Sequence, residues 1–242
     1  MTYCLGMNLD AGMVFVSDSR TNAGVDNIGK FEKMRVYARS GDRMLVTLSA
    51  GNLSVTQNVL SLIEQRARAG GANSVWHVDS MYDVACLIGE AMREIQRRDG
   101  DYMRKNNIDA SASFVLGGQI QGEPPRLFMV YTEGNFIESS HDTSFFQIGE
   151  VKYGKPILDR VLVPGTPLDD AVKCALISFD STMRSNISVG PPLDVLVYRK
   201  DSFSIELQKR LEEGDPYLIL IRQQWGEGLR RVFSGLSGPE WA

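Results

Sequence analysis

The order of strand-like and helix-like segments constrains the fold of this chain more than any other feature of its sequence. Paired β-prone runs open the chain, two helix-like segments follow, and strand-like runs then return. Another helix-like segment, a last strand pair and a helical tail complete the order. Strands grouped apart from helices predict an α+β fold with two stacked sheets inside and helices outside, rather than strict strand-helix alternation. The absence of the G-x-G-x-x-G and G-x-x-x-x-G-K-[ST] patterns agrees with this prediction.

Periodicity and turn residues set the expected boundaries of these segments. Strands are predicted at 3–9, 13–17, 33–39, 43–49, 112–119, 126–132, 135–138, 193–199 and 202–208. Helices are predicted at 52–69, at 80–98 and at 166–184, the last with Thr166 as N-cap. Asp215 and Pro216 are expected to begin a final helix, so 214–242 is a C-terminal helical extension of a single domain spanning 1–242.

Composition excludes several classes of function. The formal charge is -4, from 26 basic and 30 acidic residues, and no run of Lys or Arg suggests a nucleic-acid partner. The longest apolar run, Tyr217 to Ile221, is too short to span a membrane, and the absence of a signal or transit peptide predicts a cytoplasmic protein. Three widely spaced cysteines and two histidines without paired-ligand spacing predict neither a disulfide framework nor a metal site.

Thr2 is the first candidate for chemistry. Removal of Met1 would leave Thr2 with a free α-amine beside its own hydroxyl, which combines a base and a nucleophile in one residue. The α-amine has a reference pKa of about 7.7 to 8.0, so a substantial fraction is neutral near neutral pH and can accept the hydroxyl proton. Many chains begin with Met-Thr for no chemical reason, so Thr2 alone does not establish an enzyme.

Asp18 and Lys33 are the next candidates. Asp18 ends the second predicted strand and Lys33 opens the third, so a meander can bring both beside Thr2. A lysine near Thr2 would disfavour protonation of the amine, and Asp18 would keep that lysine charged and oriented. The alternative is an ordinary solvated ion pair at a strand end.

A turn of small residues at 49–52 follows the buried strand 43–49 and precedes a helix. Such a turn presents backbone N–H groups that can stabilise an oxyanion, here near Ala50 and Gly51. Most turns of this composition only reverse the chain.

Thr2, Gly12–Thr21, Lys33–Arg35 and Ser49–Asn52 follow one another in an order and near a spacing that resemble the N-terminal threonine hydrolases of proteasome type. Two further stretches, Gln147–Arg160 and Ser178–Pro192, are within that superfamily most similar to the Anbu (ancestral β-subunit) family. The resemblance implies a four-layer αββα sandwich in which Thr2 is the nucleophile, Asp18 and Lys33 tune it, and the backbone of Ala50 and Gly51 forms the oxyanion hole.

The chain departs from the family pattern at two positions. Glu150 stands where proteasomes place a serine, and the family's Asp and Ser, three apart, align with Ser185 and Ser188, so the acid is absent. These residues are therefore possible auxiliary groups, and the loop at 186–190 is expected to wrap the N-terminus.

The resemblance implies a threonine peptidase or amidohydrolase that acts on a peptide or amide substrate and needs neither metal nor cofactor. A narrow amidase or transferase, or a scaffold without activity, is the alternative. The resemblance also implies self-association into a ring or an open helical ring-like homo-oligomer, with an unfoldase partner left unspecified. Arg residues beside Trp225 and Phe233 make the extension either an assembly element or a helix packed on its own subunit.

Overall fold

The computed structural model describes residues 2–22 and 28–241, which form two antiparallel five-stranded sheets, one two-stranded ribbon and five helices. The first sheet has the order β10-β1-β2-β11-β12 and the second the order β5-β6-β7-β8-β9. The α+β class predicted from the sequence is confirmed.

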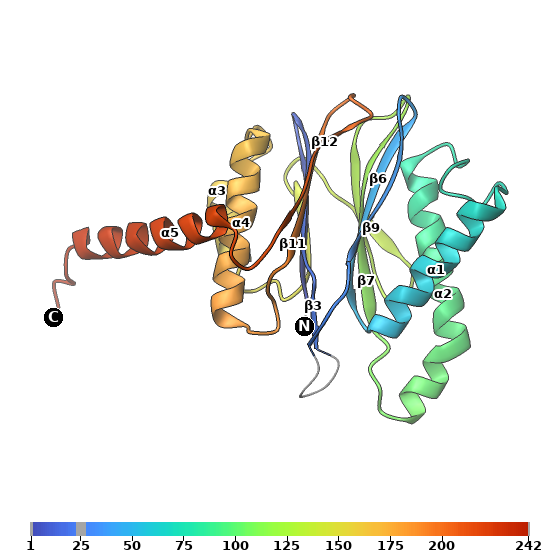
Figure 1. Cartoon of the computed structure of the whole chain (residues 1–242), viewed down its shortest axis with the longest axis horizontal. Coiled ribbons are helices and arrows are strands. Elements are labelled where there is room, and N and C mark those ends of the chain that lie inside the picture. The colour runs from blue at the N-terminus through green and yellow to red at the C-terminus, as the bar shows by residue number, and fades with distance from the viewer. Residues whose placement is uncertain (1, 23–27, 242) are drawn as a thin grey trace.

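The first sheet and its covering helices take residues from both ends of the chain. Its strands are β1 (Tyr3–Leu9), β2 (Gly12–Asp18), β10 (Phe145–Gly149), β11 (Leu193–Arg199) and β12 (Ile205–Leu211). On its outer side lie α3 (Lys155–Val161) and α4 (Leu168–Ser185), as Figure 1 shows. Strands β1 and β2 are buried on both faces, because one face packs on α4 and the other on the second sheet.

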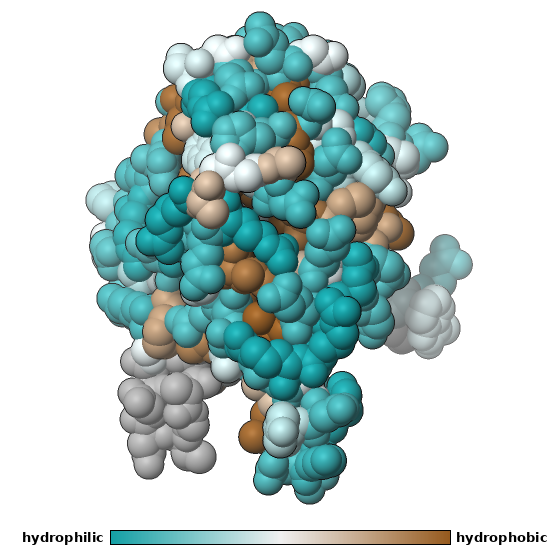
Figure 2. Space-filling view, turned by 90° about the vertical axis from the view of Figure 1, so that its right-hand side faces the viewer, coloured by the Kyte–Doolittle hydropathy of each residue, from teal (hydrophilic) through white to brown (hydrophobic). Residues whose placement is uncertain are grey.

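The second sheet comes from the middle of the chain. Its strands are β5 (Met34–Arg39), β6 (Arg43–Gly51), β7 (Ala112–Ile120), β8 (Arg126–Val130) and β9 (Phe136–Glu138). Helices α1 (Leu53–Ala69) and α2 (Met81–Lys105) cover its outer face. Viewed from the side of these helices, the surface is mostly hydrophilic with smaller hydrophobic areas (Figure 2), as expected of amphipathic helices that bury one face.

Two further elements lie outside these layers. The ribbon of β3 (Arg20–Asn22) and β4 (Ile28–Lys30) follows β2 directly. Helix α5 (Pro216–Gly235) starts against α4 and then projects away from the rest of the molecule (Figure 1). Its buried residues are Leu218 and Ile221, both in its first two turns.

Three expected boundaries are wrong. Helix α2 continues through Asp99 and Gly100 to Lys105, because the cost of a glycine in a helix, about 1 kcal/mol, is offset where Met103 packs on the core. Helix α4 has Pro167 rather than Thr166 at its N-cap, since the Thr166 hydroxyl accepts a hydrogen bond from the Val163 N–H instead.

The last strand is the third element whose expected boundaries are wrong. It covers 205–211 rather than 202–208, because the chain turns at Asp201 and Phe203, both with positive φ. Strand β12 is an edge strand, and its alternating Ile205 and Leu207 are partly exposed rather than buried.

Candidate active site

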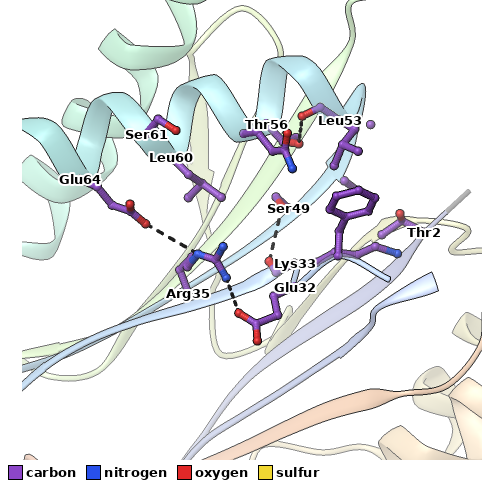
Figure 3. Close-up of a pocket in the computed structure, with 14 residues that line it drawn as sticks. Thr2, Glu32, Lys33, Arg35, Ser49, Leu53, Thr56, Leu60, Ser61 and Glu64 are labelled. Carbon is purple, nitrogen blue, oxygen red and sulfur yellow. Dashed lines mark hydrogen bonds and ion pairs between the residues drawn. The ribbon is translucent and has the colours of Figure 1, made fainter. Parts of the chain in front are cut away.

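Four chain segments meet at one end of the two sheets. Thr2 precedes β1, Asp18 ends β2, Lys33 precedes β5, and Ala50 and Gly51 end β6. The segments of Thr2, Lys33 and the end of β6 line a cavity of about 270 Å³, drawn in Figure 3, and Asp18 lies outside its lining in contact with Lys33. The cavity is lined by Thr2, Phe31, Glu32, Lys33, Arg35, Ser49, Ala50, Gly51, Leu53, Thr56, Gln57, Leu60, Ser61 and Glu64.

Lys33 and Asp18 form a buried ion pair beside Thr2. The Lys33 Nζ lies 2.6 Å from Asp18 Oδ1, and their side chains are 6% and 0% exposed. The ammonium also donates to the Arg20 carbonyl at 2.6 Å, and the Tyr3 backbone N–H donates to the same Asp18 oxygen at 3.0 Å. The alternative of a solvated pair at a strand end is therefore wrong.

Burial sets the ionisation of Asp18. It raises the pKa of this carboxyl above its usual range, while the charge and hydrogen bond of Lys33 and the Tyr3 N–H oppose that rise. A buried carboxylate without a cation would be strongly disfavoured, so the charge on Asp18 depends on Lys33.

The backbone of Thr2 is fixed by the segment that follows β10. The Glu150 N–H donates to the Thr2 carbonyl at 2.7 Å. Gly149 has a φ of +84°, and a Cβ there would lie 2.0 Å from the Thr2 oxygen, so only glycine permits this approach. Both residues belong to the stretch Gln147–Arg160, where the sequence resembles the Anbu family.

The three possible auxiliary residues are placed differently from one another. The Glu150 carboxylate is 7% exposed, lies 3.4 Å from Lys152 Nζ and accepts a 2.8 Å hydrogen bond from the Asn186 amide. Ser185 is exposed in the last turn of α4. The Ser188 N–H donates to Asn186 Oδ1 at 2.9 Å.

Asn186 is thus a residue that sequence reasoning missed. It joins the 186–190 loop to Glu150 and, through the Glu150 N–H, to Thr2. The available signal was its place at the start of the 186–190 loop, which was expected to wrap the N-terminus.

Tyr3 anchors the residue after Thr2. Its buried hydroxyl is hydrogen bonded to Ser178 Oγ at 2.7 Å and accepts from the Gln147 side-chain amide. Its ring lies 4.4 Å from that of Phe179, centroid to centroid. Burial raises the pKa of Tyr3, so the phenol stays protonated. Three elements, β1, β10 and α4, therefore hold the backbone beside Thr2.

Strand alternation predicts the direction of the backbone N–H groups at the end of β6. The Ser49 N–H points to the β5 side, where it donates to the Lys33 carbonyl at 3.0 Å, whereas the Asn52 N–H points the other way, to Ser111. Alternate residues of a strand direct their N–H groups to the same side. We therefore expect the Gly51 N–H to face the β5 side, past the beginning of β5, where Thr2 lies.

Three expectations from the sequence concern Met1, a metal site and a membrane-spanning helix. Met1, whose removal would expose the Thr2 amine, lies outside the described residues. Within 2–22 and 28–241, no group of three or more His, Cys, Asp or Glu side chains could hold a metal ion. None of the helices in that part of the chain is long and apolar enough to cross a membrane.

Comparison with known proteins identifies the family. No family model and no curated protein matches this chain. Among solved structures, Anbu (ancestral beta-subunit) from Yersinia bercovieri is 51% identical, covers 99% of this chain and 100% of its own, and has a TM-score of 0.93. The helical assembly of the Anbu complex from Pseudomonas aeruginosa is 50% identical, with 98% of both chains covered and a TM-score of 0.93. A Gly-1 mutant of Anbu from Hyphomicrobium sp. strain MC1 is 44% identical, covers 99% of this chain and 100% of its own, and has a TM-score of 0.92. The chain belongs to the Anbu (ancestral beta-subunit) family.

Proposed function

We propose that this protein is a threonine-type N-terminal-nucleophile hydrolase, a peptidase or amidohydrolase with Thr2 as its nucleophile. The observation that carries the proposal is the meeting of Thr2 and Lys33 in one cavity, with the buried Lys33–Asp18 ion pair beneath it. In this proposal the two sheets and their covering helices are the four-layer αββα sandwich of that enzyme class, a single domain with 214–242 as its extension.

The chemistry begins once everything before Thr2 has been removed. The neutral α-amine accepts the Thr2 hydroxyl proton as Oγ1 attacks the carbonyl carbon of an amide. The C–N bond then breaks, the leaving nitrogen takes the proton from the α-ammonium, and an ester to Thr2 remains. A water molecule, deprotonated by the same amine, hydrolyses the ester and regenerates Thr2.

Lys33 and Asp18 act on the first of these steps. The positive charge of Lys33 beside Thr2 lowers the pKa of the α-amine, which keeps that amine neutral and able to accept a proton. Asp18 holds the ammonium in place and also binds the Tyr3 N–H, so one carboxylate oxygen positions both the lysine and the backbone after the nucleophile.

The oxyanion needs a donor on the opposite side of the attacked carbonyl. Ala50 and Gly51 line the cavity, and the Gly51 N–H is the donor that strand alternation favours. Gly51 has a φ of +109°, and a Cβ there would lie 2.4 Å from the Ser111 carbonyl oxygen, so the close approach of β6 and the segment before β7 requires glycine.

A narrow amidase or transferase is the second candidate, and the environment of Glu150 favours it. Glu150 pairs with Asn186 and Lys152, so a carboxylate stands where the family resemblance places a serine. Ser185 is exposed and stands where the resemblance places the acid. A comparison of turnover between peptides and small non-peptide amides separates the two candidates.

Self-association belongs to the same proposal. Helix α5 projects from the molecule and exposes large apolar side chains along most of its length. The Pseudomonas aeruginosa relative is described as a helical assembly. We propose that α5 packs against a second copy of this chain in a ring or open helical homo-oligomer.

Covalent labelling tests Thr2. The intact mass of untagged protein is first measured to establish that Met1 is absent. The protein is then treated with a small β-lactone probe, and the modified peptide is sequenced by mass spectrometry. We expect one adduct, on Thr2, and none in Thr2→Ala. Thr143→Ala is the control, because Thr143 is an exposed threonine outside this cavity and should not affect labelling. Adducts at another residue, or none on protein lacking Met1, would overturn the proposal.

A further inference from the structure

The wall of the cavity away from Thr2 is charged. Successive turns of α1 contribute Leu53, Thr56 and Gln57, Leu60 and Ser61, and finally Glu64. Arg35 on β5 lies between Glu64 of α1 and Glu32, whose carboxylate is on the side of the guanidinium away from the helix, as Figure 3 shows. Apolar and polar side chains thus lead from Thr2 to an ionic group at the far end.

Arg35 lies between two carboxylates. Its Nη1 donates to Glu32 Oε2 at 2.8 Å, and its Nε lies 3.7 Å from Glu64 Oε1. One guanidinium therefore faces two carboxylates, which leaves this end of the cavity with one excess negative charge. Lys33 does not offset it, because that ammonium is already paired with Asp18.

The hydroxyl of the neighbouring Tyr37 is buried beside this ionic group. Burial, with the negative charge of Glu64 as a second cause, raises the pKa of Tyr37 to about 12, and the charge of Arg35 opposes this rise.

The hydrogen-bond acceptors at this end of the cavity also favour a cationic ligand. The guanidinium already directs Nη1 and Nε at carboxylates, whereas each carboxylate has two oxygens with several acceptor sites. The Ser61 hydroxyl and the Gln57 amide oxygen can also accept from a cation. Leu53 and Leu60 offer apolar surface to the methylene groups of a long side chain.

We propose that this cavity binds a basic side chain, lysine or arginine, of the residue whose carbonyl Thr2 attacks, and that Glu64 and Glu32 determine this specificity. The inference rests on the proposed function, since it places the attacked carbonyl at Thr2. The chain of the substrate runs along Leu53 and Leu60, and its cation displaces part of the Arg35 contact with Glu64.

Matched acyl probes test the specificity. The rate of Thr2 acylation is compared for probes that carry a lysine, norleucine or glutamate side chain next to the reactive carbonyl. We expect lysine to react fastest and glutamate slowest. Glu64→Gln and Glu32→Gln should each reduce the lysine-to-norleucine ratio about two- to fivefold, the range of one partly exposed charge pair. Arg35→Gln should raise the lysine-to-norleucine ratio.

Glu227→Gln, on the exposed part of α5, is the control and should leave the ratio unchanged. Equal rates for lysine and norleucine probes, or a faster glutamate probe, would overturn the specificity while leaving the role of Thr2 intact.

A binding measurement separates this inference from the catalytic proposal. Lysine amide and norleucine amide are titrated into Thr2→Ala, with chemical shifts of labelled Leu53 and Leu60 methyl groups as the readout. Tighter binding of lysine amide, lost in Glu64→Gln, supports the basic specificity even if Thr2 proves unreactive. No preference, together with normal Thr2 labelling in the native protein, contradicts it.

Discussion

Asp18 can remain ionised in the core only because Lys33 lies 2.6 Å from its Oδ1. Lys33→Met removes this partner and should destabilise the protein by about 3–5 kcal/mol, the usual cost of leaving one member of a buried pair alone. Asp18→Asn/Lys33→Met removes both charges and should recover most of that loss. Urea denaturation of the wild type, both single variants and the double variant measures the coupling.

The pH dependence of Lys33→Met has a defined sign. Burial raises the folded-state pKa of Asp18, and the variant lacks the lysine that opposes this rise. The folded variant therefore holds a proton that the unfolded chain has released. The free energy of unfolding of the variant should therefore fall below that of the wild type by the least at pH values under about 4, the carboxyl pKa in the unfolded chain. This deficit should grow as the pH rises through the raised pKa of Asp18 in the folded variant. A deficit that shrinks with rising pH would contradict this account.

Tyr3 should affect the reactivity of Thr2 without touching a substrate. Tyr3→Phe leaves Ser178 and Gln147 without their phenol partner, which should cost about 1–3 kcal/mol of stability and slow Thr2 labelling several-fold. Tyr198→Phe is the matched control, because Tyr198 is equally buried and donates to Gln119 at the other end of the sheet. It should lower the unfolding free energy comparably but leave the labelling rate unchanged; equal slowing in both variants would mean that Tyr3 acts only through stability.

The sequence was informative about this site where residues lie at the ends of regular strands. Asp18 is close to Thr2 because β1 and β2 form a hairpin, which the spacing of the turn residues predicts. The expected meander is wrong for Lys33, because β5 belongs to the second sheet and Lys33 reaches Asp18 from that sheet. Asn186 and the Arg35–Glu64 contact could not be predicted in this way. These contacts join side chains from different elements, whose relative placement depends on the packing of α4 and α1. Hydrophobic periodicity carries no information about that packing.

Elements with a strong apolar period were predicted well, whereas some short elements were not. Helices α1 and α4 and the hairpin of β1 and β2 lie close to their expected ranges. Strand β10 and helix α3 were missed, although both lie in the stretch that carries the family resemblance. Five residues are too few to show a period, and β10 is defined by its pairing with β1, which is distant in sequence.

Helix α5 contains glycines that lower its intrinsic stability. Gly228 lies in its middle with open space around its Cα, so Gly228→Ala adds a methyl group without a clash. We expect the helix to gain about 0.8–1 kcal/mol. Amide hydrogen exchange along α5 should slow by about fivefold. Gly71→Ala, in the turn after α1 and equally open, is the control and should leave α5 unchanged. Faster exchange in Gly228→Ala would show that a neighbouring copy packs on Gly228.

At the scale of the whole molecule, the distribution of apolar surface is uneven. The helices that cover the second sheet present a mostly hydrophilic face (Figure 2), whereas α5 exposes Val232 and Phe233 at 63% and 77%. A helix that buries only Leu218 and Ile221 against its own subunit gains little from tertiary packing. Its remaining apolar residues therefore need a second surface.

Charge placed on that surface should dissociate the proposed assembly. Phe233→Asp puts a carboxylate where a second copy would pack, and burying an unpaired charge is costly. Light scattering coupled to size-exclusion chromatography should show smaller species, with circular dichroism and the melting transition of the sheets retained. Gln223→Asp adds the same charge at an exposed polar position of α5 and should keep the mass of the wild type. If Phe233→Asp keeps the assembly intact, α5 is not its contact; if it also unfolds the sheets, the helix supports its own subunit instead of a neighbour.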